Sequence, residues 1–473
     1  MREKSESWLS SLARNPSEVL FLSLLLFLPS QLGRHFWPPF SFINGLRIDY
    51  LSPTIYFTDI IILLLILEML PIFLRTLKIR IMIPVVISLT YVSIISLYSQ
   101  WPLSSLLGVL RIVEIVIVGW LISRFIARKN LSVHIPIVLS ISLIGVSCLT
   151  IWQFLTQHSI GGLWYFLGER SFSMVTPGIA NANLSGTLVL RPYATFPHPN
   201  VLAAFCVLLI CFLLYFPARL THRLLRLLLT TAVLLGSIST ILSMSRTAIS
   251  VLALVMSVWL LRFVTRSAKN NLLILLWGIG GFGVLVVSGT LTRFSSLRIT
   301  DEAVVLREFL STQALQMFNS NFWTGVGVSN FLPTLSLELD PLLPYRNFQP
   351  VHSLYLLILS ETGVIGAVLC IVGITFLLAK VWKSRVHRLG RSMLLLCVLL
   401  LGATDHYFYT LHQGQLLLGF VLGVLLADFP PSYFTDSKAK NRGKLIQRSS
   451  SKKTMPSISL KISRTRVSSR KKR

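Results

Sequence analysis

A single histidine stands where a long polar stretch gives way to an apolar segment able to cross a membrane. His352 begins that transition, and Ser353 follows it. An imidazole titrates near neutral pH and can therefore take a proton from a hydroxyl group. The alternative is that His352 only caps a membrane helix at a wet interface. On an ideal helix Leu359, Gly363 and Gly366 return to the His352 direction, so we also expect a stripe against which another helix packs closely.

Three arginines are the candidate partners of that histidine. Arg191 and Arg246 lie at the expected outer ends of apolar segments, with no acid within ten residues of either, and Arg307 lies in the polar stretch before His352. Guanidinium groups are preferred partners of phosphate oxygens, so Arg191 and Arg246 predict a phosphate site. The alternative for Arg191 and Arg246 is that each reaches toward the phosphates of membrane lipids.

Two polar residues follow Arg191 in the run from Arg191 to Asn200. His198 is flanked by Pro197 and Pro199, which favours a role in positioning this loop, and direct contact with a substrate is the second possibility. Asn200 adds an amide at the start of the next apolar segment. We include both residues in the predicted substrate site.

The elements that carry these residues are predicted from composition. Of the 473 residues, 53% are hydrophobic and only 13% are charged, which is typical of an all-α polytopic membrane protein. A membrane span needs about 20 apolar residues. We count about twelve such segments, near residues 17–33, 54–74, 81–98, 104–122, 135–156, 199–217, 227–244, 247–261, 272–290, 353–379, 392–408 and 413–428.

The distribution of basic residues predicts the orientation. With both termini in the cytoplasm, most of the 44 lysines and arginines fall on the inner side, and every inner loop carries at least three. Two large loops, about 157–198 and 291–352, then lie outside. Loops of this length are usually functional. The transmembrane domain is expected over residues 1–428.

The net charge of +27 does not by itself indicate nucleic acid. Much of it comes from the basic segment 429–473, which we expect to be disordered and to lie on anionic lipids; a specific partner is the alternative. Within the spans, Arg111 and Glu114 are three residues apart and are expected to form an ion pair, with an ion or proton relay as the alternative. No cluster of outer carboxylates suits Mg²⁺ or Mn²⁺, so neither a metal nor a cofactor is expected.

Several motifs occur in an order that resembles the O-antigen ligase and polymerase family of integral-membrane enzymes. They are the run from Arg191 to Asn200, the turn Ser245-Arg246-Thr247-Ala248, Arg307 with Gly325-Val326-Gly327 and Asn330-Phe331, and His352-Ser353 followed by Gly363 and Gly366. The resemblance covers roughly residues 190–425. It implies transfer of a polyprenyl-pyrophosphate-linked glycan at the outer face of a bacterial cytoplasmic (inner) membrane.

The resemblance also implies that the site catalyses a metal-independent reaction that inverts the anomeric carbon. His352 is then the base toward the acceptor hydroxyl, and the three arginines hold the pyrophosphate. Two departures affect the pattern: Ser353 stands where the family often has Asn, and Phe322-Trp323-Thr324 stand where a Pro commonly precedes the Gly-Val-Gly segment. The polar patch Asp405-His406-Tyr407 resembles another family feature, with capping and substrate contact both open.

The acceptor is left open by the sequence. A glycan, a lipid core or a protein can each be the acceptor, so a repeat-unit polymerase, a ligase and a protein O-oligosaccharyltransferase all remain. A transporter or flippase for lipid-linked glycans is a rival of a different class. Transporters favour charged sites at the midplane and internal repeats, whereas here the polar groups gather at one membrane face.

Overall fold

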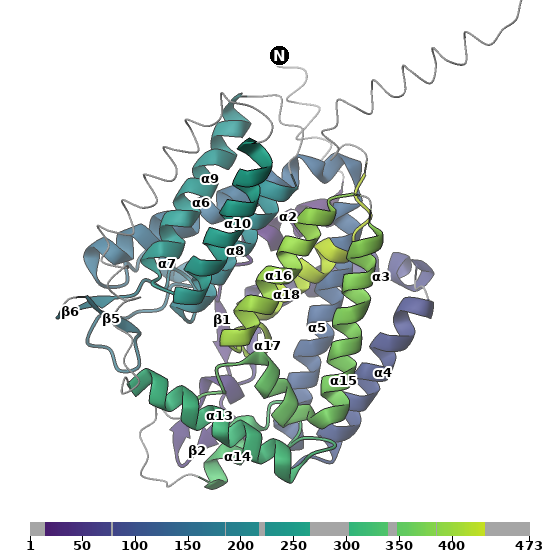
Figure 1. Ribbon diagram of the computed structural model, residues 1–473, viewed down its shortest axis with the longest axis vertical. Helices are drawn as coiled ribbons and strands as arrows, with labels where there is room; N and C mark the ends of the chain where they lie inside the picture. The colour runs from purple at the N-terminus through teal and green to yellow at the C-terminus, as the bar shows by residue number, and fades with distance from the viewer. Residues whose placement is uncertain are drawn as a thin grey trace, which may run out of the picture. The chain divides into compact units, whose positions relative to one another are not determined.

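The computed structural model describes residues 15–76, 79–184, 186–216, 223–264, 302–338, 348–384 and 386–430 (Figure 1). Most of these residues are helical. The longer helices are α2 (Pro16–Leu26), α3 (Phe57–Thr76), α4 (Ile79–Leu97), α5 (Pro102–Ile126), α6 (His134–Thr156), α8 (Pro199–Tyr215), α9 (Arg223–Leu242), α10 (Arg246–Val264), α13 (Glu302–Ser320), α14 (Phe331–Glu338), α15 (Leu354–Lys383), α16 (Arg388–Thr404) and α18 (His412–Leu426).

Among the described residues, five helical segments are long and apolar enough to cross a membrane: Phe57–Arg75, Pro102–Ile126, Lys129–Thr156, Arg223–Leu242 and Leu354–Lys383. Shorter apolar helices cover Pro16–Leu26, Ile83–Leu97, Pro199–Tyr215 and His412–Leu426. The mostly helical fold agrees with the sequence. The count of twelve spans and the side of each terminus stay predictions, and the expected span 272–290 and most of the tail 429–473 lie outside the described residues.

Helix α8 lies at the centre of the main apolar core. Its sequence is apolar on every side, and nearly all of its residues are buried. A helix without a polar face must be surrounded by other elements. It is surrounded here by α6, α9, α10, α16 and α18. Because Asn200 is in the first turn of α8, this packing holds one end of the predicted site in place.

The two predicted outer loops contain secondary structure of their own. The first carries the short helix α7 (Leu163–Phe166) and an antiparallel hairpin of β5 (Asn181–Leu184) and β6 (Thr187–Leu190). The second carries α13 and α14. Leu310, Ala314 and Met317 of α13 are buried together with Phe331 and Leu335 of α14. Their three- and four-residue spacing gives α13 one apolar face, which is why this polar stretch forms a helix.

Small paired strands shape the segment between α2 and α3. Strand β1 (Gly33–His35) pairs antiparallel with β4 (Thr54–Tyr56), and β2 (Phe42–Ile43) pairs with β3 (Leu46–Arg47). Strand β4 leads directly into α3. It therefore fixes the position at which α3 begins.

The prediction of one continuous helical stripe from His352 to Gly366 is wrong. Helix α15 begins at Leu354, with the hydroxyl of Ser353 accepting from the backbone N–H of Leu356, so His352 lies before the helix. The helix is then interrupted at Gly363, whose φ of 62° and ψ of −168° are not helical. Glycine adopts such a conformation without the steric cost that a side chain imposes.

The interruption in α15 is filled by the loop that carries Gly325-Val326-Gly327. The N–H of Val326 donates to the carbonyl of Ser360 at 3.0 Å, and the N–H of Val364 donates to the carbonyl of Phe322 at 2.9 Å. A Cβ on Gly363 would lie 2.4 Å from the carbonyl carbon of Trp323. A loop, rather than a neighbouring helix, therefore uses the close approach that this glycine permits.

Glu361 fixes the same loop from its side-chain end. Its carboxylate accepts the N–H of Ser329 at 2.7 Å, the N–H of Phe331 at 3.1 Å and the hydroxyl of Tyr409 at 2.9 Å. These three bonds satisfy a buried acid. Glu361 thus joins the loop to α15 and to the segment after α16.

Candidate active site

His352 faces a carboxylate that comes from another helix. Its Nδ1 lies 3.6 Å from Oδ1 of Asp405, an ion-pair distance longer than a hydrogen bond. The side chain of His352 is 16% exposed, so it is neither walled off nor open to bulk solvent. No hydrogen-bond partner of Nδ1 is found in the described part of the chain. The imidazole is therefore poised beside a negative charge.

Asp405 is held in place at the end of α16. Its Oδ2 accepts from the side-chain amide of Asn200 at 2.7 Å, and its Oδ1 accepts from the backbone N–H of His406 at 2.8 Å. Burial alone would raise the pKa of Asp405, but the nearby histidines, His352 foremost, outweigh it and hold that pKa below its usual value. The carboxylate is therefore ionised at neutral pH.

Arg191 continues this chain of contacts. Its Nη2 donates to Oδ1 of Asn200 at 2.7 Å, and its Nε donates to the backbone carbonyl of Ser243 at 2.8 Å. Arg191 is only 7% exposed, so reaching out to lipid phosphates is not its role. Ser243 lies in the turn between α9 and α10. Arg191 is thereby tied to the turn that carries Arg246, the first residue of α10.

His198 caps α8. Its Nδ1 accepts from the backbone N–H of Asn200 at 3.2 Å, which requires that nitrogen to be unprotonated. Burial is the main reason that the pKa of His198 lies below its usual value, and the charge of Arg191 acts in the same direction. This geometry agrees with the positioning role expected from its flanking prolines, because His198 orients the first turn that presents Asn200.

His406 and Arg307 complete the surroundings of His352. The rings of His352 and His406 are 5.4 Å apart, and a hydrogen bond of 2.6 Å joins Nδ1 of His406 to Oγ1 of Thr410. Arg307, in the second turn of α13, is exposed, and its charge acts on His406. One end of each of α8, α13, α15 and α16 thus contributes to the surroundings of His352.

Sequence reasoning did not identify the part that Asp405 plays in the candidate active site. The sequence singled out Asp405 only as part of the patch Asp405-His406-Tyr407, for which capping and substrate contact were both left open. The structure brings His352, Asn200 and Arg191 together through this carboxylate. Arg246 follows the turn whose Ser243 carbonyl binds Arg191, and the charge of Arg307 acts on His406, but no direct contact of either arginine with His352 or Asp405 is found among the described residues.

Two groups of side chains in the described residues have the spacing of metal ligands. They are His352, Asp405 and His406, and separately Asp59, Glu114 and His412. In the second group Arg111 donates to both carboxylates, so a guanidinium already supplies the positive charge there. In the first group Asp405 already accepts from Asn200 and His406. A divalent ion would have to compete with those bonds.

Comparison with known proteins shows that part of the chain is similar to a protein family. Residues 231–371 match the family model described as O-antigen ligase. The chain carries an O-antigen ligase domain. Members of this family are membrane proteins that act on lipid-linked glycans, which agrees with the apolar helices. No curated protein matches the chain.

The region that matches the O-antigen ligase family model contains part of the site. Arg246, Arg307 and His352 lie within residues 231–371, as does the interruption at Gly363. Arg191, His198, Asn200 and Asp405 lie outside it. Their relation to His352 is seen only in the folded chain, where Asn200 joins Arg191 to Asp405.

Proposed function

We propose that this protein transfers or polymerises a polyprenyl-pyrophosphate-linked glycan at the outer face of the bacterial cytoplasmic membrane, without a metal and with inversion. The supporting observation is the contact between His352 and the ionised Asp405, which Asn200 joins to Arg191. The proposed base His352, the carboxylate of Asp405 beside it and the guanidinium group of Arg191 therefore belong to one chain of contacts.

In this proposal His352 accepts the proton of the acceptor hydroxyl. The acceptor oxygen attacks the anomeric carbon of the donor glycan, and the bond from that carbon to the pyrophosphate breaks on the opposite side. The electron pair leaves with the pyrophosphate, so negative charge grows on it. Arg191, Arg246 and Arg307 are the cations that stabilise this charge in place of a metal. Attack opposite the leaving group inverts the anomeric carbon.

Asp405 is a positioning residue in this scheme. When His352 takes the proton it becomes an imidazolium cation, and an ionised carboxylate at 3.6 Å stabilises that cation. Asn200 keeps the carboxylate directed at His352 because its amide nitrogen binds Oδ2 while its amide oxygen binds Arg191. Movement of the arginine is thereby coupled to the orientation of the base.

The test is transfer by the His352→Ala protein. Base catalysis contributes roughly 10²- to 10⁴-fold, so His352→Ala should lose most activity while its amount in the membrane stays that of wild type. Wild-type turnover by this variant would remove His352 from the role of base. Activity that survives removal of divalent ions with EDTA supports the metal-independent reaction, and activity restored only by an added ion contradicts it.

Glycan analysis of a deletion strain separates the acceptors. Chains of a single repeat unit indicate a polymerase, and complete polymer that remains unattached to its lipid core indicates a ligase. Loss of glycan from a modified protein indicates an oligosaccharyltransferase. Accumulation of the lipid-linked glycan on the cytoplasmic leaflet indicates a flippase, and that outcome contradicts the enzymatic proposal.

A further inference from the structure

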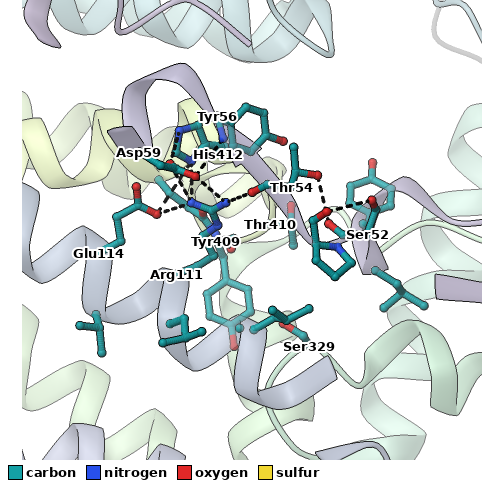
Figure 2. Close-up of a pocket in the computed structure, with 18 of the residues that line it drawn as sticks. Ser52, Thr54, Tyr56, Asp59, Arg111, Glu114, Ser329, Tyr409, Thr410 and His412 are labelled. Atoms are coloured by element: carbon teal, nitrogen blue, oxygen red, sulfur yellow. Dashed lines mark hydrogen bonds and ion pairs between the residues drawn. The ribbon is translucent and has the colours of Figure 1, made fainter. Parts of the chain in front are cut away.

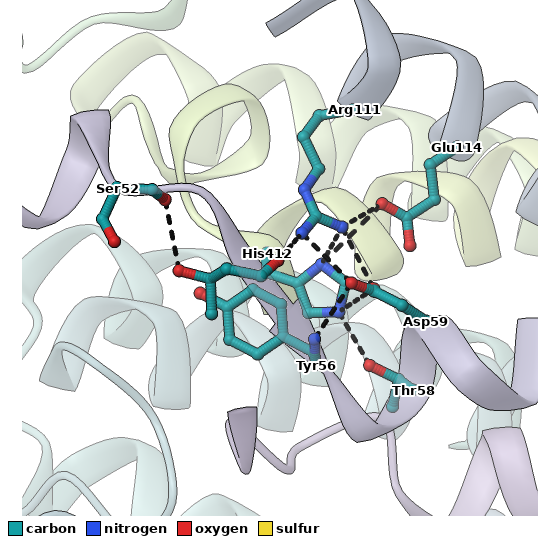
Figure 3. Close-up of polar contacts among 8 residues, drawn as sticks. Ser52, Tyr56, Thr58, Asp59, Arg111, Glu114 and His412 are labelled. Atoms are coloured by element: carbon teal, nitrogen blue, oxygen red, sulfur yellow. Dashed lines mark hydrogen bonds and ion pairs between the residues drawn. The ribbon is translucent and has the colours of Figure 1, made fainter. Parts of the chain in front are cut away.

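A second polar cluster lies on three other helices. Arg111 of α5 binds both carboxylate oxygens of Asp59 on α3, at 3.0 and 3.1 Å, and also binds Glu114 one turn further along α5. His412, the first residue of α18, lies 3.3 Å from Nη1 of Arg111 and binds Thr58 at 2.7 Å (Figure 3). The ion pair expected between Arg111 and Glu114 is confirmed, but it belongs to a larger set.

The cluster forms one wall of a cavity of about 520 Å³ (Figure 2). Tyr50 and Thr410, which also line the cavity, contact His406 of the candidate active site: the ring centroid of Tyr50 is 5.7 Å from that of His406, and Thr410 binds its Nδ1. Pro350, two residues before His352, is a further lining residue. The cavity therefore adjoins the predicted base.

The same two helices, α3 and α5, also line the cavity with apolar side chains, some of which reach the surface of the helical domain. This apolar lining includes Leu63 and Ile66 of α3 and Leu110, Val113 and Ile117 of α5. Leu63 and Leu110 are each 55% exposed. Helix α3 packs against α2, whereas α5 packs against α4 and α18. Apolar side chains of α3 and α5 thus extend from the exposed surface of these helices into the cavity.

The polar wall is built to accept hydrogen bonds rather than to bind an anion. The two terminal nitrogens of Arg111 are occupied by Asp59, Glu114, His412 and the carbonyl of Thr54. Because a guanidinium only donates, the Nδ1 of His412 that faces it must be unprotonated, so His412 is neutral. Two carboxylates, those of Asp59 and Glu114, face one guanidinium, so this wall has more acceptor oxygens than Arg111 alone can satisfy.

Glu114 supplies the free acceptor of this wall. Its Oε1 is buried and has no hydrogen-bond partner within the described part of the chain. A buried acceptor without a partner is costly, and a donor from a bound molecule relieves that cost. A phosphate, which itself offers only acceptors and negative charge, is disfavoured here.

We propose that this cavity binds the acceptor, as an amphiphile whose apolar chain enters between α3 and α5 and whose hydroxyl or amino group donates to Glu114. The inference rests on the proposed function for the statement that the bound molecule is the acceptor. The two substrates are then separated by charge: the diphosphate donor lies with the arginines near His352, and the acceptor lies on the side with excess carboxylate.

The test uses three probes that share one photoreactive alkyl chain and differ in head group: a glucoside, an ammonium and a phosphate. Each is photolysed with the full-length protein in lipid nanodiscs, and labelled peptides of α3 and α5 are quantified. We expect the glucoside and the ammonium probe to label these peptides at least about tenfold more than the phosphate probe, as a charge-dependent hydrogen bond predicts. Glu114→Gln should reduce that preference.

Matched variants separate the cavity from the general lipid surface. Leu63→Trp and Leu110→Trp should block labelling, whereas Leu64→Trp and Leu106→Trp should not, because Leu64 and Leu106 are exposed on the same helices but do not line the cavity. Equal labelling by the phosphate probe would assign the cavity to the donor lipid and overturn the inference. If the amount of labelling is the same in all four variants as in wild type, the inference is overturned as well.

The outcome is distinguishable from failure of the proposed function. His352→Ala should label as wild type does, because labelling needs no transfer. If this variant transfers glycan normally while the cavity probes behave as expected, the enzymatic role of His352 fails and the binding site stands. If His352→Ala is inactive but the probes show no head-group preference, the binding site fails and the enzymatic proposal stands.

Discussion

Asn200 and Asp405 determine how the imidazole of His352 is held. The carboxylate of Asp405 accepts from Asn200 at 2.7 Å and lies 3.6 Å from His352. An asparagine at position 405 can keep an acceptor toward Asn200, but it removes the negative charge beside the base. The size of that electrostatic contribution can therefore be isolated with a nearly isosteric change.

We expect Asp405→Asn to lower kcat for glycan transfer by at least about tenfold, with little change in the KM of the lipid-linked donor, because the imidazolium form of the base loses its stabilising charge. The measurement is steady-state transfer by purified protein in nanodiscs. Asp428→Asn is the matched control. Asp428 lies two residues after the C-terminal end of α18, whereas Asp405 lies before the N-terminal end of that helix. An unchanged kcat in Asp405→Asn would mean that the carboxylate has no part in proton transfer.

His406 gives the site a pH-dependent stability. Burial lowers the pKa of His406 to about 4, and the charges of His352 and Arg307 oppose the effect of Asp405. In the unfolded chain a histidine titrates near about 6.5. Between these two values the unfolded state binds a proton that the folded state does not, so stability falls as pH falls through this range.

We therefore expect the wild-type thermal unfolding midpoint to decrease as the pH is lowered from about 6.5 toward about 4, and the decrease to be smaller in His406→Asn. An asparagine can still bond to Thr410 but cannot take up a proton. Scanning fluorimetry across this pH range measures both slopes, with the exposed His158→Asn as the control. Parallel slopes for wild type and His406→Asn would show that His406 is not the group responsible.

At the scale of elements, the interruption of α15 explains how His352 is presented. The loop from Phe322 to Gly327 bonds to both sides of the break at Gly363, and Glu361 anchors the end of that loop. The helix therefore cannot slide relative to α13 and α14 without breaking these bonds. Because His352 lies just before the same helix, its position follows from this junction.

Gly363→Ala should destabilise the protein by roughly 2 kcal/mol or more, because it combines a positive φ with a collision against the backbone of Trp323. Gly373→Ala is the matched control on α15, where an added Cβ meets nothing within 4 Å. There alanine should be neutral or slightly stabilising. Thermal unfolding in detergent compares the two, and equal midpoints would show that the break tolerates a side chain.

At the scale of the whole molecule, apolar composition and periodicity were enough to predict a helical membrane protein and the position of most described helices. They failed at α13, whose apolar face is narrow within a polar stretch, and at Gly363, where the break depends on a loop from elsewhere in the chain. The contact between Asn200 and Asp405 joins residues 205 positions apart. Such a contact depends on how α8 and α16 pack, which no local pattern encodes.

The orientation of the molecule is the remaining large-scale prediction, because basic residues gather in the loops expected inside. Leu188 of β6 is 59% exposed in the expected outer loop 157–198, and Leu224 of α9 is 76% exposed beside the expected inner residues Arg223 and Arg226. In intact spheroplasts a membrane-impermeant maleimide should label Leu188→Cys but not Leu224→Cys, and after lysis it should label both. Wild-type protein gives the background from the five native cysteines. Labelling of Leu224→Cys alone in intact spheroplasts would invert the topology and place His352 on the cytoplasmic side, where an acceptor at the outer face is out of reach.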